Sequence, residues 1–333
     1  MRIDIHGHFI PPAYLDEVRR ADNPYGRSLE GIPRGGQGLV LRPGVVFEMP
    51  PPLHDVAGLV KELDTLGIDV IALMPPPIIF HYELGGDAID RHCRLLNDGM
   101  AEVAARQRDR LVAMGVVPLQ DRERALAELD RIVTGLGLPA VVICSNVSGR
   151  NLDDPDFRPF FARARELGVF VFVHPWFVAG AERMQRYHLW NAVGNVFDTS
   201  IAIASLIFAG IVREMPDLKI CFAHGGGATP FIIGRIDRAW AVRPEAHNAI
   251  PEPPSRYLAA LHVDTVVHSQ EALAYVVRGQ GSDRVLLGSD CPFHLGDTGE
   301  PRPVERVRAL GLPAVDEARI LGGNAARLLG LAR

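Results

Sequence analysis

Eight short apolar runs recur along this chain, separated by amphipathic stretches. The runs are nearly continuous rather than alternating, which is typical of parallel strands covered by helices. Strands are predicted at Arg2–His6, Ile68–Met74, Leu111–Val117, Pro139–Cys144, Val169–His174, Lys219–His224, Ala260–Thr265 and Arg284–Asp290. Helices are predicted at Asp55–Leu66, Asp90–Arg108, Arg122–Gly135 and Asp156–Leu167. Eight such units predict an α/β fold of the (β/α)8 TIM-barrel class, with residues 1–333 as a single domain.

Two segments do not fit the bare barrel. Phe9–Pro52 is rich in Pro and Gly, and we interpret residues 9–52 as an insertion after the first strand that caps the barrel mouth. The alternative is a surface excursion without a role. Phe177–Ser200 is predicted to be a helical lid or a subunit contact. An open doubly wound sheet is the rival fold, and the absence of a GxGxxG motif after the first strand weakens its dinucleotide-binding form.

Composition excludes several classes of protein. The formal net charge is −5 and no basic cluster occurs, so nucleic acid is not an expected partner. No membrane partner is expected either: the apolar segment Ile201–Ile211 is shorter than the roughly 20 residues of a membrane span, and the first residues lack the apolar core of a signal peptide. The four cysteines are scattered without a CxxC pair, which favours a cytoplasmic location.

The polar residues at the strand ends carry the chemical information. In a TIM barrel, catalytic groups lie at the carboxyl ends of the strands. His6 and His8, two residues apart, point to the same side of a strand, and His174 and Asp290 end two others. Three imidazoles and one carboxylate suit one divalent metal ion, with zinc expected first and manganese as the alternative. Taken singly, these could be unrelated buried histidines and, for Asp290, a helix N-cap.

His224 ends the sixth predicted strand and precedes three glycines, which would let the backbone approach a ligand closely. A histidine beside an open metal position is suited to general acid/base catalysis, since its ordinary pKa is near neutrality. The alternative is that His224 is itself a ligand.

Several motifs together resemble the decarboxylase branch of the amidohydrolase superfamily. The likeness extends from Met1 to about Gly323 and includes KICFAHGGGATPFIIG at Lys219–Gly234. The motifs are Asp4-Ile-His-Gly-His8, Phe172-Val-His-Pro-Trp176, Cys221-Phe-Ala-His-Gly-Gly-Gly-Ala228 and Leu287-Gly-Ser-Asp-Cys-Pro-Phe293.

The resemblance implies a role for each matching residue. The metal ligands would be His6, His8, His174 and Asp290, with His224 and Asp290 as the catalytic residues. Arg235 matches an arginine that reaches a substrate carboxylate in the neighbouring subunit, so a homodimer is implied. Aromatic positions near the substrate are matched by Trp190 and Phe293, and we expect Phe47, Met49 and Trp176 to line the same pocket.

One departure from the branch concerns the substrate. An arginine that holds a substrate carboxylate in these enzymes is replaced here by Phe47 or Glu48, and Arg42 is the nearest substitute. A glutamate would repel a dicarboxylate, so a substrate with one carboxylate fits better.

The sequence therefore predicts a metal-dependent decarboxylase, a carbon–carbon lyase, acting on a small carboxylated aromatic or a ring-fission product of the muconate-semialdehyde type. The alternative within the superfamily is a hydrolase or hydratase of an amide, lactone or C–C bond. A barrel that binds a partner around a structural metal is the alternative outside catalysis. Release of carbon dioxide would distinguish the decarboxylase from both alternatives.

Overall fold

The computed structural model describes residues 1–32, 36–296, 298–299 and 301–331. Its main sheet has eight parallel strands, and each of them pairs with the next strand of this sheet in sequence order. They are β1 (Ile3–His8), β5 (Val70–Met74), β6 (Leu111–Val116), β7 (Ala140–Cys144), β10 (Phe170–His174), β11 (Ile220–Phe222), β12 (His262–Asp264) and β13 (Val285–Leu286). The seam closes where Ile5 N donates to Leu287 O at 2.9 Å and Gly7 pairs with Cys291. The predicted (β/α)8 barrel is confirmed.

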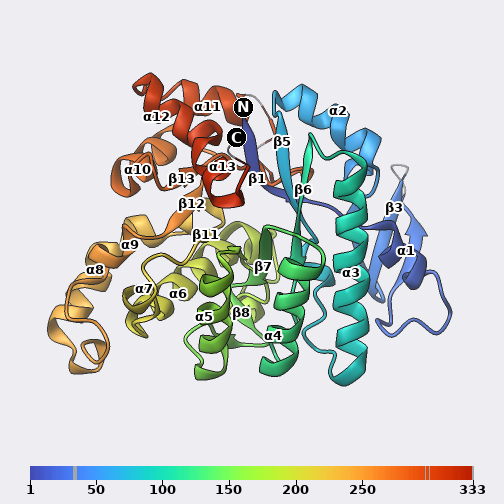
Figure 1. The fold of residues 1–333 in the computed structure, drawn as a ribbon, viewed down its shortest axis with the longest axis horizontal. Coiled ribbons are helices and arrows are strands. Elements are labelled where there is room, and N and C mark those ends of the chain that lie inside the picture. The colour runs from blue at the N-terminus through green and yellow to red at the C-terminus, as the bar shows by residue number, and fades with distance from the viewer. Residues whose placement is uncertain (33–35, 297, 300, 332–333) are drawn as a thin grey trace.

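Helices surround the barrel (Figure 1). The α-helices beyond the insertion are α2 (Val56–Leu66), α3 (Gly86–Arg106), α4 (Arg122–Asp130), α5 (Arg158–Leu167), α6 (Asn195–Phe208), α7 (Ile211–Glu214), α8 (Thr229–Val242), α9 (Pro254–Leu258), α10 (Gln270–Gln280), α11 (Pro303–Arg308), α12 (Ala314–Ala318) and α13 (Asn324–Leu329). Short 3-10 or π turns are η1 (Pro51–Leu53), η2 (Pro77–Ile79), η3 (Arg131–Gly135), η4 (Pro155–Phe157), η5 (Ala181–Arg183), η6 (Trp190–Gly194), η7 (His224–Gly226), η8 (Pro244–Ala246) and η9 (Arg319–Gly323). A small hairpin joins β8 (Asn146–Val147) to β9 (Arg150–Asn151).

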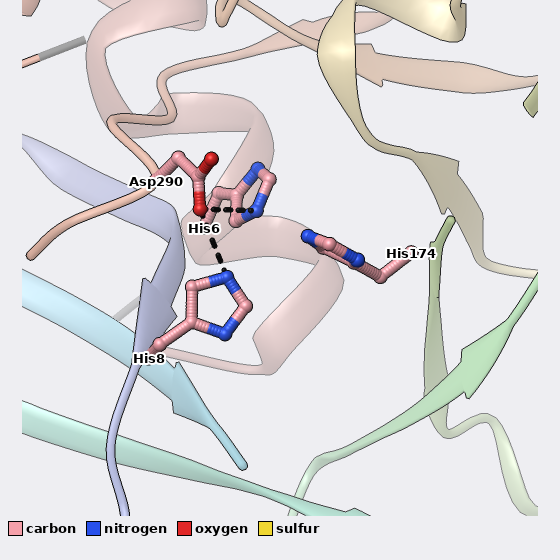
Figure 2. A group of neighbouring side chains, drawn as sticks. All are labelled: His6, His8, His174 and Asp290. Carbon is pink, nitrogen blue, oxygen red and sulfur yellow. Dashed lines mark ion pairs between the residues drawn. The ribbon is translucent and has the colours of Figure 1, made fainter. Parts of the chain in front are cut away.

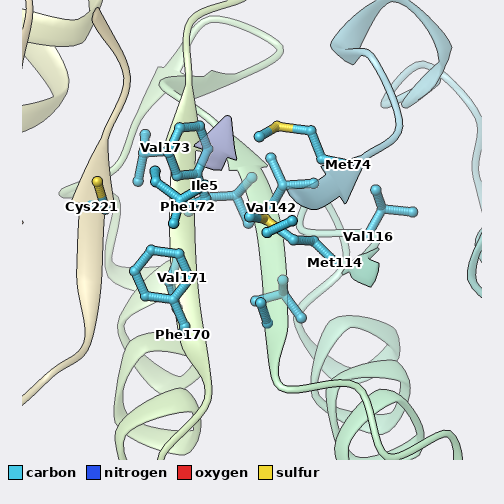
Figure 3. Close-up of a cluster of buried hydrophobic side chains, with 14 of the residues drawn as sticks. Ile5, Met74, Met114, Val116, Val142, Phe170, Val171, Phe172, Val173 and Cys221 are labelled. Carbon is cyan, nitrogen blue, oxygen red and sulfur yellow. The ribbon is translucent and has the colours of Figure 1, made fainter. Parts of the chain in front are cut away.

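The barrel strands form the core of the molecule. Every residue of β5, β7 and β10 is buried, which explains why their sequences are apolar without alternation. Figure 3 shows part of this core, with Phe170 and Phe172 among the side chains of neighbouring strands. The strands therefore provide a rigid base on which the polar groups at their carboxyl ends are held.

The predicted strands Lys219–His224 and Arg284–Asp290 extend too far at their carboxyl ends. His224 and Asp290 lie beyond β11 and β13, and each has a φ of 57°. This left-handed conformation is incompatible with a strand and costs a non-glycine residue about 1–3 kcal/mol. Both residues therefore sit in turns above the barrel rather than on it.

The insertion at residues 9–52 is a small structure of its own. It consists of α1 (Pro12–Val18) and an antiparallel sheet of β2 (Ser28–Gly31), β3 (Gln37–Arg42) and β4 (Val45–Met49). In Figure 1 it lies on one flank of the barrel, beside α3. Tyr14 and Leu39 are fully buried in the same core as the barrel strands, so the insertion packs as part of one body.

One described helical stretch, Trp190–Phe208, has the length and apolar composition of a membrane span. No such stretch was expected from the sequence, where the apolar segment Ile201–Ile211 is too short, but η6 and α6 form one continuous helical stretch. Half of this window is buried inside the fold, as in the core helix of a folded barrel.

Candidate metal centre and active site

Four predicted ligands converge at the carboxyl end of the barrel (Figure 2). One potential ligand atom from each of His6, His8, His174 and Asp290 lies within 4.8 Å of all the others. His6 and His8 come from β1, His174 ends β10, and Asp290 follows β13. Asp290 Oδ1 lies 2.9 Å from His8 Nε2 and 3.3 Å from His6 Nε2. The next helix in the described part of the chain begins at Pro303, so Asp290 is not a helix N-cap.

The atoms that face one another in this cluster lack hydrogen-bond partners. Nε2 of each of the three histidines and Oδ1 of Asp290 are buried without one. The other ring nitrogens of His6 and His174 donate to Asp264 Oδ2 at 2.7 Å and Pro175 O at 2.9 Å. Those bonds place the ring protons on Nδ1 and leave Nε2 free to coordinate. The donor set fits a divalent metal ion, which would satisfy every one of these atoms.

Electrostatics favour a cation in the same position. Burial lowers the pKa of His8 to about 4 and lowers that of His174 well below its ordinary value, so both imidazoles are neutral. Burial would also lower the pKa of His6, but the charges of Asp290 and Asp264 outweigh it and raise this pKa to about 10. The two carboxylates thus create a negative potential that a bound cation would neutralise.

Asp264, at the end of β12, is a site residue that the sequence analysis missed. Its Oδ2 accepts the bond from His6, and its Oδ1 accepts bonds from the backbone nitrogens of Gly225 at 2.8 Å and Val266 at 3.1 Å. The same strand-end rule would have found it, because Asp264 lies near the end of the weak predicted strand Ala260–Thr265. A carboxylate behind a metal-binding histidine fixes the tautomer and orientation of the ring.

His224 lies beside the cluster but outside the group of four ligand atoms. Its Nε2 is 3.6 Å from Asp290 Oδ2, and its buried Nδ1 has no hydrogen-bond partner. The glycines after it pack closely, and one of them, Gly227, also lines the larger of the two cavities beside the cluster. A Cβ on Gly227, where φ is 64°, would lie 2.1 Å from the carbonyl oxygen of Val196 on α6. This close contact fixes the turn that holds His224.

Two cavities meet at the cluster. The smaller, of about 270 Å³, is lined by the predicted aromatic residues together with His174 and Asp290; these aromatic residues are Phe47, Trp176, Trp190 and Phe293. The larger, of about 650 Å³, is lined by His224, Asp290 and Phe231 among others. Asp290 is one of four residues common to both, the others being Asn191, Asn195 and Leu295.

Not every predicted substrate residue reaches these cavities. Arg235 is exposed on α8 and lines neither cavity of its own chain. Glu48 is exposed, while Met49 is buried in the core, because successive residues of β4 face opposite sides. Phe47 is the residue of β4 that lines the smaller cavity. Among the described lining residues of the two cavities there is no Arg or Lys.

Comparison with known proteins agrees with this geometry. A family model described as amidohydrolase matches residues 3–331, so the chain belongs to the amidohydrolase family. The 2-amino-3-carboxymuconate-6-semialdehyde decarboxylase of Dictyostelium discoideum is 35% identical over 99% of this chain and 92% of its own length. Within the family, the chain therefore lies in the decarboxylase branch.

Solved structures share the fold. The 5-carboxyvanillate decarboxylase of Sphingomonas paucimobilis is 25% identical, with a TM-score of 0.82 over 99% of this chain and 98% of that one. A dihydroxybenzoic acid decarboxylase of Polaromonas sp. JS666, 21% identical, has a TM-score of 0.80 over 100% of this chain and 97% of that one. The latter structure contains bound manganese and the inhibitor 2-nitroresorcinol.

Proposed function

We propose that this protein is a metal-dependent decarboxylase of small carboxylated aromatic or ring-fission molecules. The observation that carries the proposal is the set of three free imidazole nitrogens and one carboxylate at the junction of two cavities, with His224 beside it. The decarboxylases among its relatives support the same reaction.

We propose His6, His8, His174 and Asp290 as the ligands of one divalent ion. A nitrogen-rich set favours zinc, and manganese is the alternative because a structural neighbour contains it. When bound, such an ion supplies Lewis acidity toward a carboxylate or hydroxyl oxygen and lowers the pKa of a bound water.

The side chains supply the proton that decarboxylation consumes. Breaking the bond between a carbon and its carboxylate leaves an electron pair on that carbon, and one proton must replace the carbon dioxide lost. We propose that His224, whose Nε2 lies 3.6 Å from Asp290 Oδ2, carries this proton to the carbon. In the alternative, Asp290 delivers it. The aromatic walls of the smaller cavity would hold the ring flat and exclude water.

The cavity lining supports a substrate with one carboxylate. A second carboxylate would meet no Arg or Lys from the described lining of either cavity, so its desolvation would be uncompensated. A doubly carboxylated substrate such as that of the Dictyostelium relative would therefore depend on a cation from a second copy of the chain, which Arg235 would supply in the dimer proposed below.

We propose that the protein forms a homodimer in which Arg235 reaches the site of the other copy. Phe231 is 83% exposed at the larger cavity, and Phe197 and Ile201 are exposed on α6. Arg235 lies one turn after Phe231 on α8. A two-fold interface over this apolar face would bury these side chains and bring α8 of each copy to the other's larger cavity.

We also propose a cytoplasmic location. It rests on the four cysteines, which are buried and unpaired.

The deciding experiment follows substrate loss and carbon dioxide release by zinc- and manganese-loaded protein. The substrates are hydroxybenzoates, carboxyvanillate and 2-amino-3-carboxymuconate-6-semialdehyde. We expect one carbon dioxide per molecule of a monocarboxylated aromatic consumed. If the metal-loaded protein consumes a substrate without releasing carbon dioxide, the decarboxylase proposal is wrong and the hydrolase or hydratase alternative takes its place.

A further inference from the structure

Asn195, the first residue of α6, has an unsatisfied amide at the junction of the two cavities. The residue is 6% exposed, its Oδ1 is buried without a hydrogen-bond partner, and it lines both cavities together with Asp290. A buried amide oxygen without a partner is unfavourable, because the hydrogen bond that it makes with water in the unfolded chain is lost on folding. Asn195 Oδ1 therefore requires a hydrogen-bond donor that the described residues do not provide.

The other polar residues on this part of α6 have protein partners. Asp198 accepts bonds from Ser145 and from Asn146 Nδ2. Thr199 Oγ1 donates to the carbonyl oxygen of Asn195 at 2.9 Å, and Ser200 Oγ donates to Val196 O at 2.8 Å. Asn195 thus differs from these neighbours in that its side-chain oxygen has no hydrogen-bond partner, although the residue lines both cavities.

The helix geometry immediately before Asn195 is also unusual. η6 (Trp190–Gly194) is a π turn, and such turns occur frequently at functional sites because they re-aim the side chains around them. Gly194 packs closely, since a Cβ there would lie 2.6 Å from Val178 Cγ2. This segment presents Trp190 to the smaller cavity and Asn195 to both.

We propose that Asn195 is a specificity-determining residue that accepts a hydrogen bond from a hydroxyl or amino group of the substrate. The inference rests on the proposed decarboxylase and narrows its substrate class to a monocarboxylated ring that bears such a donor. A carboxylate or nitro oxygen cannot satisfy the amide oxygen, because neither has a proton to donate. Sites built around a buried hydrogen-bonding group reject ligands that lack the partner group.

The test measures binding to zinc-loaded protein by calorimetry. The probes are benzoate, its 2-, 3- and 4-hydroxy derivatives and 2-aminobenzoate, which share one carboxylate and differ in the donor. In the unsubstituted protein we expect at least one donor position to improve affinity about tenfold over benzoate. In Asn195→Leu, which has similar volume without the amide, that ratio should fall to about one, with the zinc content unchanged.

Two further variants separate recognition from helix stability. Thr199→Val removes the hydrogen bond to the Asn195 backbone but leaves the amide, so the donor preference should persist. Asn195→Asp keeps an acceptor oxygen, so the preference should also persist, while all benzoates weaken together through charge repulsion. If Asn195→Leu does not fold, Asn195→Ala takes its place.

An unchanged donor preference in Asn195→Leu or Asn195→Ala would overturn the inference. Failure of all five probes to bind zinc-loaded protein would overturn it together with the aromatic substrate class. A different result would contradict the decarboxylase proposal alone. In that case binding would depend on the donor group and on Asn195, but none of the acids would release carbon dioxide. That result would keep Asn195 as a recognition residue in an enzyme with another reaction.

Discussion

The carboxylate of Asp264 lies 2.7 Å from Nδ1 of His6 and also holds the backbone nitrogen of Gly225, the residue after His224. One buried side chain therefore orients a proposed metal ligand and, through the turn, the proposed acid/base. The metal position and the proton carrier are mechanically connected through this residue.

Asp264→Asn should weaken metal binding without preventing folding. The amide is nearly isosteric, but it no longer raises the basicity of His6, and such partners contribute about 10–100-fold in metal affinity. Competition with a chelator measures the change. Ser269→Ala, in the cap of α10 and away from the ligands, is the control. Equal zinc affinity in Asp264→Asn would contradict the role.

His174→Ala and His224→Ala should separate binding from catalysis. Loss of His174 removes one of four proposed ligands, so metal content after dialysis should drop. Loss of His224 should leave the metal in place and reduce turnover about 10²–10⁴-fold. Elemental analysis and carbon dioxide release are measured on the same samples. Full activity of metal-loaded His224→Ala would eliminate the acid/base assignment.

The dimer proposal predicts complementation between inactive chains. When His224→Ala and Arg235→Ala chains are mixed before folding, half of the dimers are mixed and each contains one intact site. About a quarter of the unsubstituted turnover should return. Mixing His224→Ala with His174→Ala is the matched control, because both lesions fall within a chain's own site and no intact site forms. Activity equal in the two mixtures would show that Arg235 does not cross.

His262 on β12 should make the fold sensitive to acid. Its Nδ1 donates to Ile220 O at 3.1 Å and its Nε2 accepts from Arg284 at 3.2 Å, so the ring is held neutral. Burial, followed by the charge of Arg284, lowers its pKa from 6.5 to about 4. Between these values the unfolded chain binds a proton that the folded chain does not. The free energy of unfolding should therefore fall by up to about 3 kcal/mol as the pH drops through that window.

The variant His262→Asn can keep the bond to Ile220 and cannot titrate. Urea unfolding at about pH 7 and about pH 5 should show a smaller loss of stability in His262→Asn than in the unsubstituted protein. A loss of the same size in both would assign the acid sensitivity to other groups.

The barrel and the proposed ligand set could be predicted because both depend on a local rule. Fully buried strands must be apolar throughout, and a polar residue at the end of such a strand stands out, as His174 does. The exact ends of β11 and β13 could not be predicted, since the left-handed backbone at His224 and Asp290 is imposed by packing. The sheet β2–β4 was missed because its strands are half exposed and interrupted by Gly and Pro.

The remaining site residues give weaker signals. Asp264 was overlooked because it lies one residue before the end of the predicted strand Ala260–Thr265, so it did not stand out as the polar residue that ends an apolar run. Asn195 has no sequence signal, because one asparagine in an apolar helix is compatible with a solvent-facing position. Only its burial next to open space distinguishes it.

The seam between β13 and β1 joins the two ends of the chain at the site itself. Asp290 N donates to His6 O at 2.8 Å, and His8 N donates to Cys291 O at 2.7 Å. A growing polypeptide that has not yet been translated through Asp290 has an incomplete donor set and an open seam. Capture of the proposed ion would consequently be a late event in biogenesis, after synthesis of the last strand and closure of the barrel.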